Sequence, residues 1–223
     1  MASDYRPSQP FVFPSGNDMN ISIQSAIETR TSVNNFQPDR PLDDDAIATL
    51  VDLATKAPSA YNLQNWRFIA VRSEDAKARL KSAAFGQRKV GDASVAFIIC
   101  GTLAAHGHLR TALKPSVEAN IMDQRTVDAW VAQVTESHQD DPALQRDEAV
   151  RSASLAAMTL MLAAQGMGLG SCAMGGFDGA QVAREFGLAT TELPVMIVAV
   201  GHPAVSNWPQ KPRKPLPEVL AIV

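Results

Sequence analysis

The sequence predicts an α+β fold in which helices pack around a central sheet. Three short runs rich in apolar and β-branched residues are typical of buried strands, at Phe68 to Val71, Val95 to Cys100 and Val195 to Val200. Two or three helices precede the first of these strands, which differs from the regular βαβ alternation of a doubly wound fold. The 223 residues suit one domain, which we place at residues 20–223 after an N-terminal arm of residues 1–19.

Capping residues and apolar periodicity predict the helices. The first helix follows Asn20, a good N-cap, and carries Ile23 and Ile27. The second repeats apolar residues from Leu42 to Ala57, where Pro58 ends it. Further helices are expected at about residues 74–84, 116–138 and 179–186.

The most apolar segment, residues 149–164, predicts a helix buried on every side, either in a large core or in a subunit interface. Its longest apolar run, Leu155 to Ala164, is interrupted by Thr159. This run is far shorter than the roughly 20 apolar residues that a bilayer span needs. We therefore expect no membrane helix and consider the segment a candidate dimer core.

Composition and charge exclude several classes of protein. With 46% hydrophobic and 19% charged residues, the chain is globular and not disordered, and its net charge of −3 offers no general attraction for nucleic acid. Cys100 and Cys172 lie far apart in apolar runs, which predicts free core thiols in a reducing compartment, the cytoplasm. The first residues lack the basic and apolar regions of a secretory signal.

The histidines and cysteines offer no pattern for hydrolysis or metal binding. The G-x-S-x-G elbow of serine hydrolases is absent from the sequence. His106 and His108 have no cysteine or carboxylate cluster at ligand spacing, so we expect an exposed loop pair and no metal. Cys172 has neither a second cysteine nor an obvious cation beside it, which favours a packing role over redox chemistry.

Six of the thirteen glycines lie between Gly166 and Gly179, directly after the apolar helix. Such crowding indicates either that the backbone approaches something closely or that a helix cap and a tight turn follow one another. The dinucleotide motif G-x-G-x-x-G is absent, because Ser171 or Ala173 occupies the place of the third glycine. A Rossmann-type site is therefore excluded.

Two separate segments carry residues that suit a phosphate. Arg30, Thr31 and Ser32 end the first helix, and Lys211 and Arg213 lie in a proline-rich tail. Guanidinium and hydroxyl groups together can bind several phosphate oxygens through charge-assisted hydrogen bonds. Each segment alone is also compatible with an ordinary solvated surface.

Five ordered motifs identify a family resemblance that spans about Ile23 to Pro217. RTSVNNF at residues 30–36 and APSAYNLQNW at residues 57–66 are similar to R-x-S-x-(K/R)-x-F and A-P-S-x-x-N-x-Q-P-W. FGQRK at 85–89 with DAS at 92–94, the glycine-rich segment 168–178 ending in GFD, and KPR at 211–213 follow in order. Together they resemble the FMN-dependent nitroreductases, in particular the oxygen-insensitive NAD(P)H nitroreductases.

This resemblance implies a mostly antiparallel sheet and an intertwined homodimer whose flavin sites lie at the subunit interface. Pro58, Ser59 and Asn62 would line the flavin from the partner subunit, Lys89 would lie at its pyrimidine edge, and Gln87 could hydrogen-bond the ring. The FMN phosphate would be bound by Arg30, Ser32, Lys211 and Arg213, and backbone N–H groups at Gly175 and Gly176 would face the reactive nitrogen. The implied cofactor-binding set is Arg30, Thr31, Ser32, Asn34, Pro58, Ser59, Ala60, Asn62, Gln87, Lys89, Met174, Gly175, Gly176, Lys211 and Arg213.

Three residues depart from the family pattern. Asn34 stands where a cation is usual, Asn65 replaces the proline before the tryptophan, and Gly175 replaces an acidic residue before Gly-Phe-Asp. The backbone donor at Gly175 survives its substitution. Residues 104–145 match the family weakly and would cover the substrate pocket, with Met122 and Trp130 as candidate wall residues.

The resemblance implies an FMN-dependent NAD(P)H oxidoreductase that reduces nitroaromatics, quinones or related acceptors by ping-pong hydride transfer. No catalytic side chain is expected, because the flavin carries the chemistry. The alternatives are other flavin chemistry on the same fold, namely enoate reduction, dehalogenation or azole oxidation, and a flavin-binding protein without turnover. The final residues, Leu216 to Val223, could cross to the partner as a swapped arm.

Overall fold

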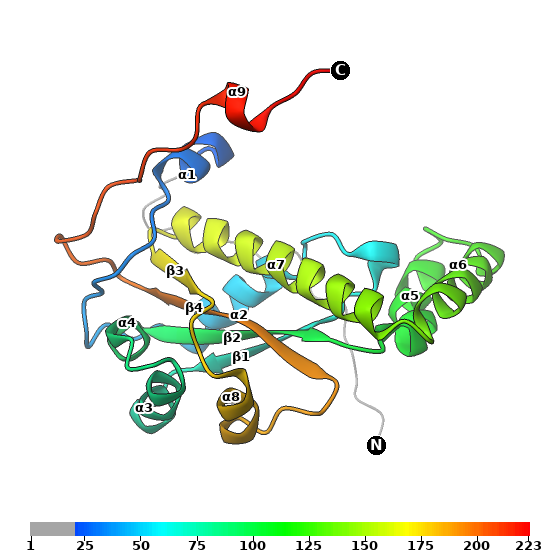
Figure 1. Ribbon diagram of the computed structural model, residues 1–223, viewed down its shortest axis with the longest axis horizontal. Helices are drawn as coiled ribbons and strands as arrows, with labels where there is room; N and C mark the ends of the chain where they lie inside the picture. The colour runs from blue at the N-terminus through cyan, green and yellow to red at the C-terminus, as the bar shows by residue number, and fades with distance from the viewer. Residues whose placement is uncertain (1–20) are drawn as a thin grey trace.

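A four-stranded, fully antiparallel sheet with the order β1-β2-β4-β3 forms the centre of the molecule, as the computed structural model of residues 21–223 shows (Figure 1). The strands are β1 (Trp66–Val71), β2 (Val95–Thr102), β3 (Gly170–Met174) and β4 (Glu192–Gly201). This confirms the predicted α+β class and the antiparallel sheet. The N-terminal arm and the expected cap Asn20 lie outside the described residues.

Strand β3 corrects the sequence-based interpretation of the glycine-rich segment as a turn. Gly170 to Met174 pair in register with Gly201 to Ile197 of β4. Turns bracket this strand, since Gly168 has a φ of +72° and Gly175 and Gly176 follow the last paired residue. The sequence GSCAM has no β-branched residue, so β-propensity alone gave no reason to predict a strand there.

Helices cover both faces of the sheet (Figure 1). Their bounds are α1 (Ile23–Thr29), α2 (Asp44–Ala54), α3 (Glu74–Ala83), α4 (Arg88–Asp92), α5 (Leu109–Glu118), α6 (Gln124–His138), α7 (Pro142–Gly166), α8 (Gly179–Glu185) and α9 (Leu216–Val219).

Local capping explains where the helices depart from the predicted bounds. Ser22 caps α1, because its hydroxyl accepts a hydrogen bond from the N–H of Ser25. Asp43 caps α2, which therefore begins at Asp44 and not at the predicted Leu42. The helix ends at Ala54, before the predicted end at Ala57. The single helix expected over 116–138 is instead the end of α5 followed by α6, because Asn120 has a left-handed φ of 56° and Asp123 caps a new helix.

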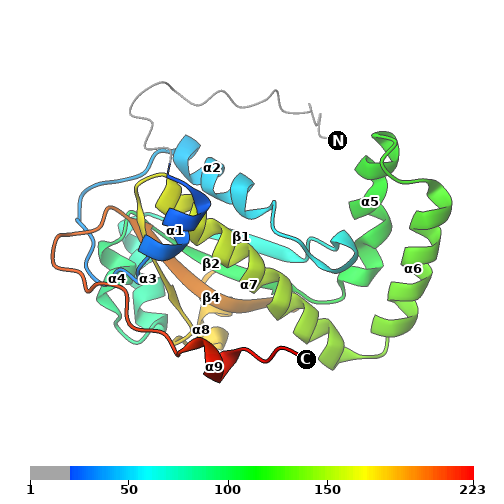
Figure 2. The same cartoon turned by 90° about the horizontal axis from the view of Figure 1, so that it is seen from above.

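The central strand β2 divides its side chains between two cores. Phe97 packs with Leu50 of α2 and Leu160 of α7, whereas Ile98 packs with Leu80 of α3 on the opposite face. This alternation follows from the two-residue period of a strand. Helices α5 and α6 form a third apolar cluster with the two 3₁₀ turns, η1 (Ala60–Asn62) and η2 (Ala105–His108), at one end of the molecule (Figure 2).

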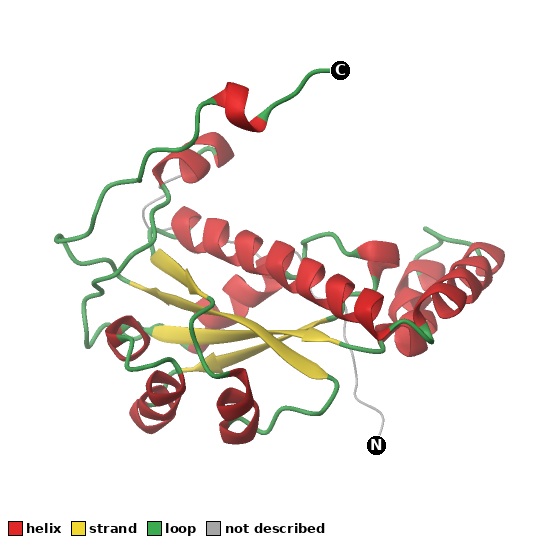
Figure 3. Cartoon of the chain, in the orientation of Figure 1, coloured by secondary structure: helices red, strands yellow, loops and turns green. Residues whose placement is uncertain are grey.

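Within one chain helix α7 is buried on one side only, so a large core does not surround it, and the predicted subunit interface stays a prediction. Ala149, Ala153 and Leu160 are fully buried against the sheet, but Leu155 and Met158 are 43% and 37% exposed. Within residues 21–223, no helix is long and apolar enough to cross a membrane. The chain after β4 is loop apart from the short α9, and it extends away from the sheet (Figure 3).

Candidate functional site

A cavity of about 260 Å³ lies beside strand β3, between the segment after α1, helix α4 and the C-terminal tail. It is lined by residues from all four of these elements, including four cations. Among the described lining residues none is acidic. The lining set is Arg30, Thr31, Ser32, Asn34, Lys89, Cys172, Ala173, Trp208, Pro209, Gln210, Lys211 and Arg213.

The segment after α1 is placed by the free edge of β3. The N–H of Val33 donates to the carbonyl of Ser171 at 3.0 Å, and Ser32 forms a parallel bridge with Ser171. The buried ring of Phe36 and its antiparallel bridge to Pro203 hold the far end of the segment. The sheet edge therefore fixes the backbone that carries Arg30, Thr31 and Ser32.

The C-terminal tail forms another side of the cavity, next to the segment after α1. The side-chain amide of Gln210 donates to the carbonyl of Arg30 at 3.2 Å. Trp208 lies beneath Lys211, with the ammonium 5.1 Å from the ring centroid, a cation–π contact. Sequence reasoning missed Trp208, Gln210 and the neighbouring Asn207, because no local pattern in the tail shows which of its side chains meet the cavity or a distant segment.

The cations of the cavity are available to bind an anion. Lys89 donates to the side-chain oxygen of Asn34 at 3.2 Å, and Arg213 donates to the carbonyl of Lys211 at 2.8 Å. In the described part of the chain, no carboxylate lies within ion-pair distance of Arg30, Lys89, Lys211 or Arg213. Several uncompensated positive charges around one cavity favour a multivalent anion such as a phosphate group.

Gln87, Met174, Gly175 and Gly176 are absent from the cavity lining, but they lie in or next to elements that form it. Gln87 precedes α4, and its side-chain amide donates to the carbonyl of Gly176 at 2.8 Å. That bond joins the turn after β3, which contains Gly175, to the helix that carries Lys89. Met174, at the end of β3, is buried in the core.

Pro58, Ser59, Ala60 and Asn62 lie apart from the cavity, in and just before the turn η1. The hydroxyl of Ser59 accepts a hydrogen bond from the N–H of Gln64, and Asn62 has a left-handed φ of 57°. The turn packs against the α5–α6 region, where Tyr61 makes an edge-on contact with Trp130. One chain therefore does not unite the two predicted halves of the site.

Both cysteines are free and buried, as predicted. Burial and the nearby charge of Glu192 raise the pKa of Cys100 to about 12, so its thiol stays protonated. Cys172 is 3% exposed and packs in the core beside the cavity that it partly lines.

The histidine pair differs from the expected exposed loop. His106 and His108 lie in η2, and only His108 is exposed. His106 packs 6.3 Å from His138, measured between ring centroids, and its Nδ1 is buried without a partner among the described residues. No group of three or more metal-ligating side chains occurs within residues 21–223.

Comparison with known proteins assigns this architecture to a family. The model of the nitroreductase family matches residues 27–202. YodC of Bacillus subtilis (strain 168), whose name provisionally assigns it to the NAD(P)H nitroreductases, is 33% identical over 193 residues, which is 86% of this chain and 95% of YodC.

Two further matches carry information about ligands and reactions. A protein of Exiguobacterium sibiricum 255-15, provisionally named a nitroreductase and solved in complex with FMN, superposes with a TM-score of 0.84 and 27% identity, covering 91% of this chain and 98% of that one. The CLA biosynthesis enone reductase of Lactiplantibacillus plantarum is 28% identical over 192 residues, covering 84% of this chain and 88% of the reductase. The chain belongs to the nitroreductase family.

Proposed function

We propose that this protein is an FMN-dependent NAD(P)H oxidoreductase, with the FMN phosphate bound in the cavity beside β3. The observation that carries the proposal is the convergence of four cations and no acidic residue, within the described chain, on one cavity. The FMN complex of the Exiguobacterium relative supports the choice of cofactor. NAD(P)H as electron donor rests on the name of YodC.

The donor set fits a phosphate monoester. Arg30 offers a planar fork of N–H groups, Ser32 and Thr31 offer hydroxyls, and Lys211 and Arg213 add two further charges. We assign Lys89 to the flavin ring, where its ammonium would favour a reduced, anionic ring. When bound, FMN supplies reversible two-electron transfer between a nicotinamide donor and a second substrate.

We further propose a homodimer in which the partner supplies Pro58, Ser59, Ala60 and Asn62 to each flavin site. Their separation from the cavity within one chain supports this arrangement. The exposed Leu155 and Met158 on α7, and the exposed apolar residues of the tail after Pro215, are surfaces that a second copy would cover. We propose the cytoplasm as the location, since both cysteines are unpaired.

Nitroaromatics and quinones are the proposed acceptors, and enoate reduction is the second candidate reaction. The similarity to an enone reductase supports that second candidate. The helices α5 and α6, with Met122 and Trp130 in their apolar cluster, are the part of the chain that we expect to select the acceptor.

The visible absorbance spectrum of the purified protein tests the proposal. The protein is mixed with FMN, freed of excess, and titrated with NADH and then NADPH without oxygen. We expect a retained flavin spectrum that bleaches with at least one nucleotide. Loss of all flavin refutes the proposed cofactor, whereas retained flavin that neither nucleotide bleaches indicates a flavin-binding protein without this activity.

The second candidate is tested on the reduced protein. A panel of nitroaromatic, quinone and enone acceptors is added, and reoxidation is followed at the flavin absorbance band. Faster reoxidation by an enone than by any nitroaromatic or quinone would replace the first candidate reaction with the second.

A further inference from the structure

We propose that Asn207 is a positioning residue that holds the cations of the C-terminal tail against the Arg30 segment, so that both act on one phosphate. Asn207 is absent from the cavity lining, so its role would be indirect. This inference rests on the proposed function, because it concerns the same phosphate site.

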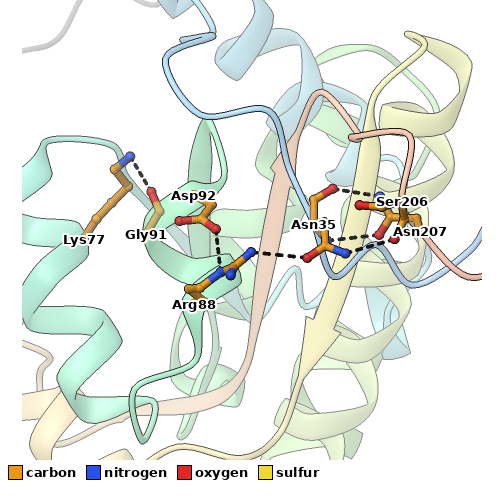
Figure 4. Close-up of polar contacts among 7 residues, drawn as sticks. All are labelled: Asn35, Lys77, Arg88, Gly91, Asp92, Ser206 and Asn207. Atoms are coloured by element: carbon orange, nitrogen blue, oxygen red, sulfur yellow. Dashed lines mark hydrogen bonds and ion pairs between the residues drawn. The ribbon is translucent and has the colours of Figure 1, made fainter.

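The side-chain amide of Asn207 uses its full hydrogen-bonding capacity, and Figure 4 shows its contacts with Asn35. Its oxygen accepts from the backbone N–H groups of Asn34 at 2.8 Å and Asn35 at 3.0 Å. Its nitrogen donates to the carbonyls of Asn35 at 2.7 Å and Ala204 at 2.8 Å. An amide has two donors and two acceptor lone pairs, and all four are used.

The side chain of Asn35 extends these contacts to helix α4, which carries Lys89. The amide nitrogen of Asn35 donates to the carbonyl of Ser206 at 3.0 Å, and its oxygen accepts from Arg88 at 3.4 Å (Figure 4). Arg88 also pairs with Asp92 at 3.1 Å. A single polar network therefore joins the three segments that supply Arg30, Lys89 and Lys211 to the cavity.

Asn207 is the last partly buried residue before the exposed C-terminal tail. Asn207 is half-buried, and every residue after it is exposed. The tail from Trp208 onward therefore has little packing in one chain to restrain it, and ordering its backbone on binding carries an entropic cost. Asn207 anchors the tail four residues before Lys211. This anchor preorganises the tail, so that less conformational entropy is lost when both tail cations bind one phosphate.

Asn207→Ala tests this role when the affinities for FMN and riboflavin are compared. Riboflavin has the same ring system and lacks the phosphate, so the ratio of the two dissociation constants isolates the phosphate contribution. We expect Asn207→Ala to bind FMN at least about tenfold more weakly, which corresponds to the loss of one hydrogen bond to a charged group. The affinity for riboflavin should change by less than about twofold. Asn207→Ser, which keeps a smaller hydrogen-bonding group, should lie between wild type and Asn207→Ala.

Gln37→Ala is the matched control. The side chain of Gln37 also joins the two segments, by donating to the carbonyl of Pro203 at 2.8 Å. Pro203 precedes Asn207 in the chain, so loss of this bond leaves the tail anchored at Asn207, next to its cations. We expect Gln37→Ala to leave the FMN-to-riboflavin ratio unchanged. Amide hydrogen exchange at Asn34 and Asn35 gives a second readout without flavin, and should accelerate in Asn207→Ala only.

The outcomes separate this inference from the proposed function. A wild-type protein that binds neither flavin refutes the proposed function and this inference with it. A wild-type protein that binds FMN, together with equal losses of FMN and riboflavin affinity in Asn207→Ala, keeps the proposed function and overturns the positioning role. An unchanged FMN affinity in that variant overturns it as well.

Discussion

Arg30 lies at the end of α1, where the backbone turns from the helix toward the edge of β3. Its guanidinium lines the cavity and has no ion pair within the described residues. Because a hydrogen bond to a charged group contributes about 1.5 to 3 kcal/mol, Arg30→Ala should weaken FMN binding roughly 10- to 100-fold. Fluorescence titration with FMN measures this change.

The control for Arg30→Ala is Arg125→Ala, which removes an exposed arginine of α6 outside the cavity. Its FMN affinity should equal that of the wild type, and both variants should unfold at the wild-type urea concentration. Equal FMN affinity in Arg30→Ala and wild type would show that the phosphate binds elsewhere.

His106 makes the stability of the fold depend on pH. Burial, and then the neighbouring rings of His138 and His108, lower the pKa of His106 below its ordinary value of 6.5. The unfolded chain therefore binds this proton more readily, so stability falls as the pH drops below about 6.5. His106→Gln should lose less stability than the wild type between about pH 7.5 and about pH 5.5.

Urea unfolding at those two pH values measures the difference. His108→Gln, at an exposed position of the same turn, is the control and should retain most of the pH dependence of the wild type, because His108 is the smallest of the three causes that lower the pKa of His106. If His106→Gln and the wild type lost the same free energy of unfolding on acidification, His106 would not be the group responsible.

Helix α7 approaches strand β2 closely at Gly101. A Cβ atom on Gly101 would lie 2.5 Å from the carbonyl oxygen of Ala149, so any larger residue must push the helix away from the sheet. Overpacking of this kind typically costs about 1 to 3 kcal/mol. Gly101→Ala should therefore lower the urea midpoint, with a free-energy loss in that range.

Gly107→Ala is the matched substitution for this test. Gly107 lies six residues further on. It has no positive φ, and a Cβ atom at this position would have no neighbouring atom within 4 Å. We expect its urea midpoint to match the wild type or to rise slightly, because alanine reduces the entropy of the unfolded chain. A Gly101→Ala variant as stable as Gly107→Ala would contradict the close contact between α7 and β2.

The assembled protein should be a dimer whose flavin site depends on both copies. Met158 lies on the exposed side of α7 beside Leu155, where a charge would be tolerated by one chain but not in an apolar interface. We expect Met158→Glu to shift the protein to a monomer and to lower its FMN affinity. Sedimentation velocity and FMN titration on the same sample measure both effects.

Ala143→Glu provides the comparison, because it introduces the same charge at an exposed position in the first turn of α7. That variant should sediment and bind FMN like the wild type. A wild-type monomer with full FMN occupancy would contradict the dimeric site, and with it the proposed contribution of Pro58 and Asn62 from a partner.

Local patterns in the sequence were sufficient for most of the fold. Strands β1, β2 and β4 contain continuous apolar and β-branched runs, and helix α2 has an apolar period that ends before Pro58. The motifs at residues 30–36 and 211–213 also lie in two of the four elements that line the cavity. These features depend on neighbours within a few residues, and for that reason they can be predicted from the sequence alone.

Strand β3 and Asn207 depend on partners far away in the chain. The weak strand former GSCAM becomes a strand because the edge of β4 supplies hydrogen bonds to its backbone. Asn207 bonds to Asn34 and Asn35, which are more than 170 residues earlier. Backbone hydrogen bonds and polar contacts of this range carry no local periodicity, so only the folded chain reveals which segments meet.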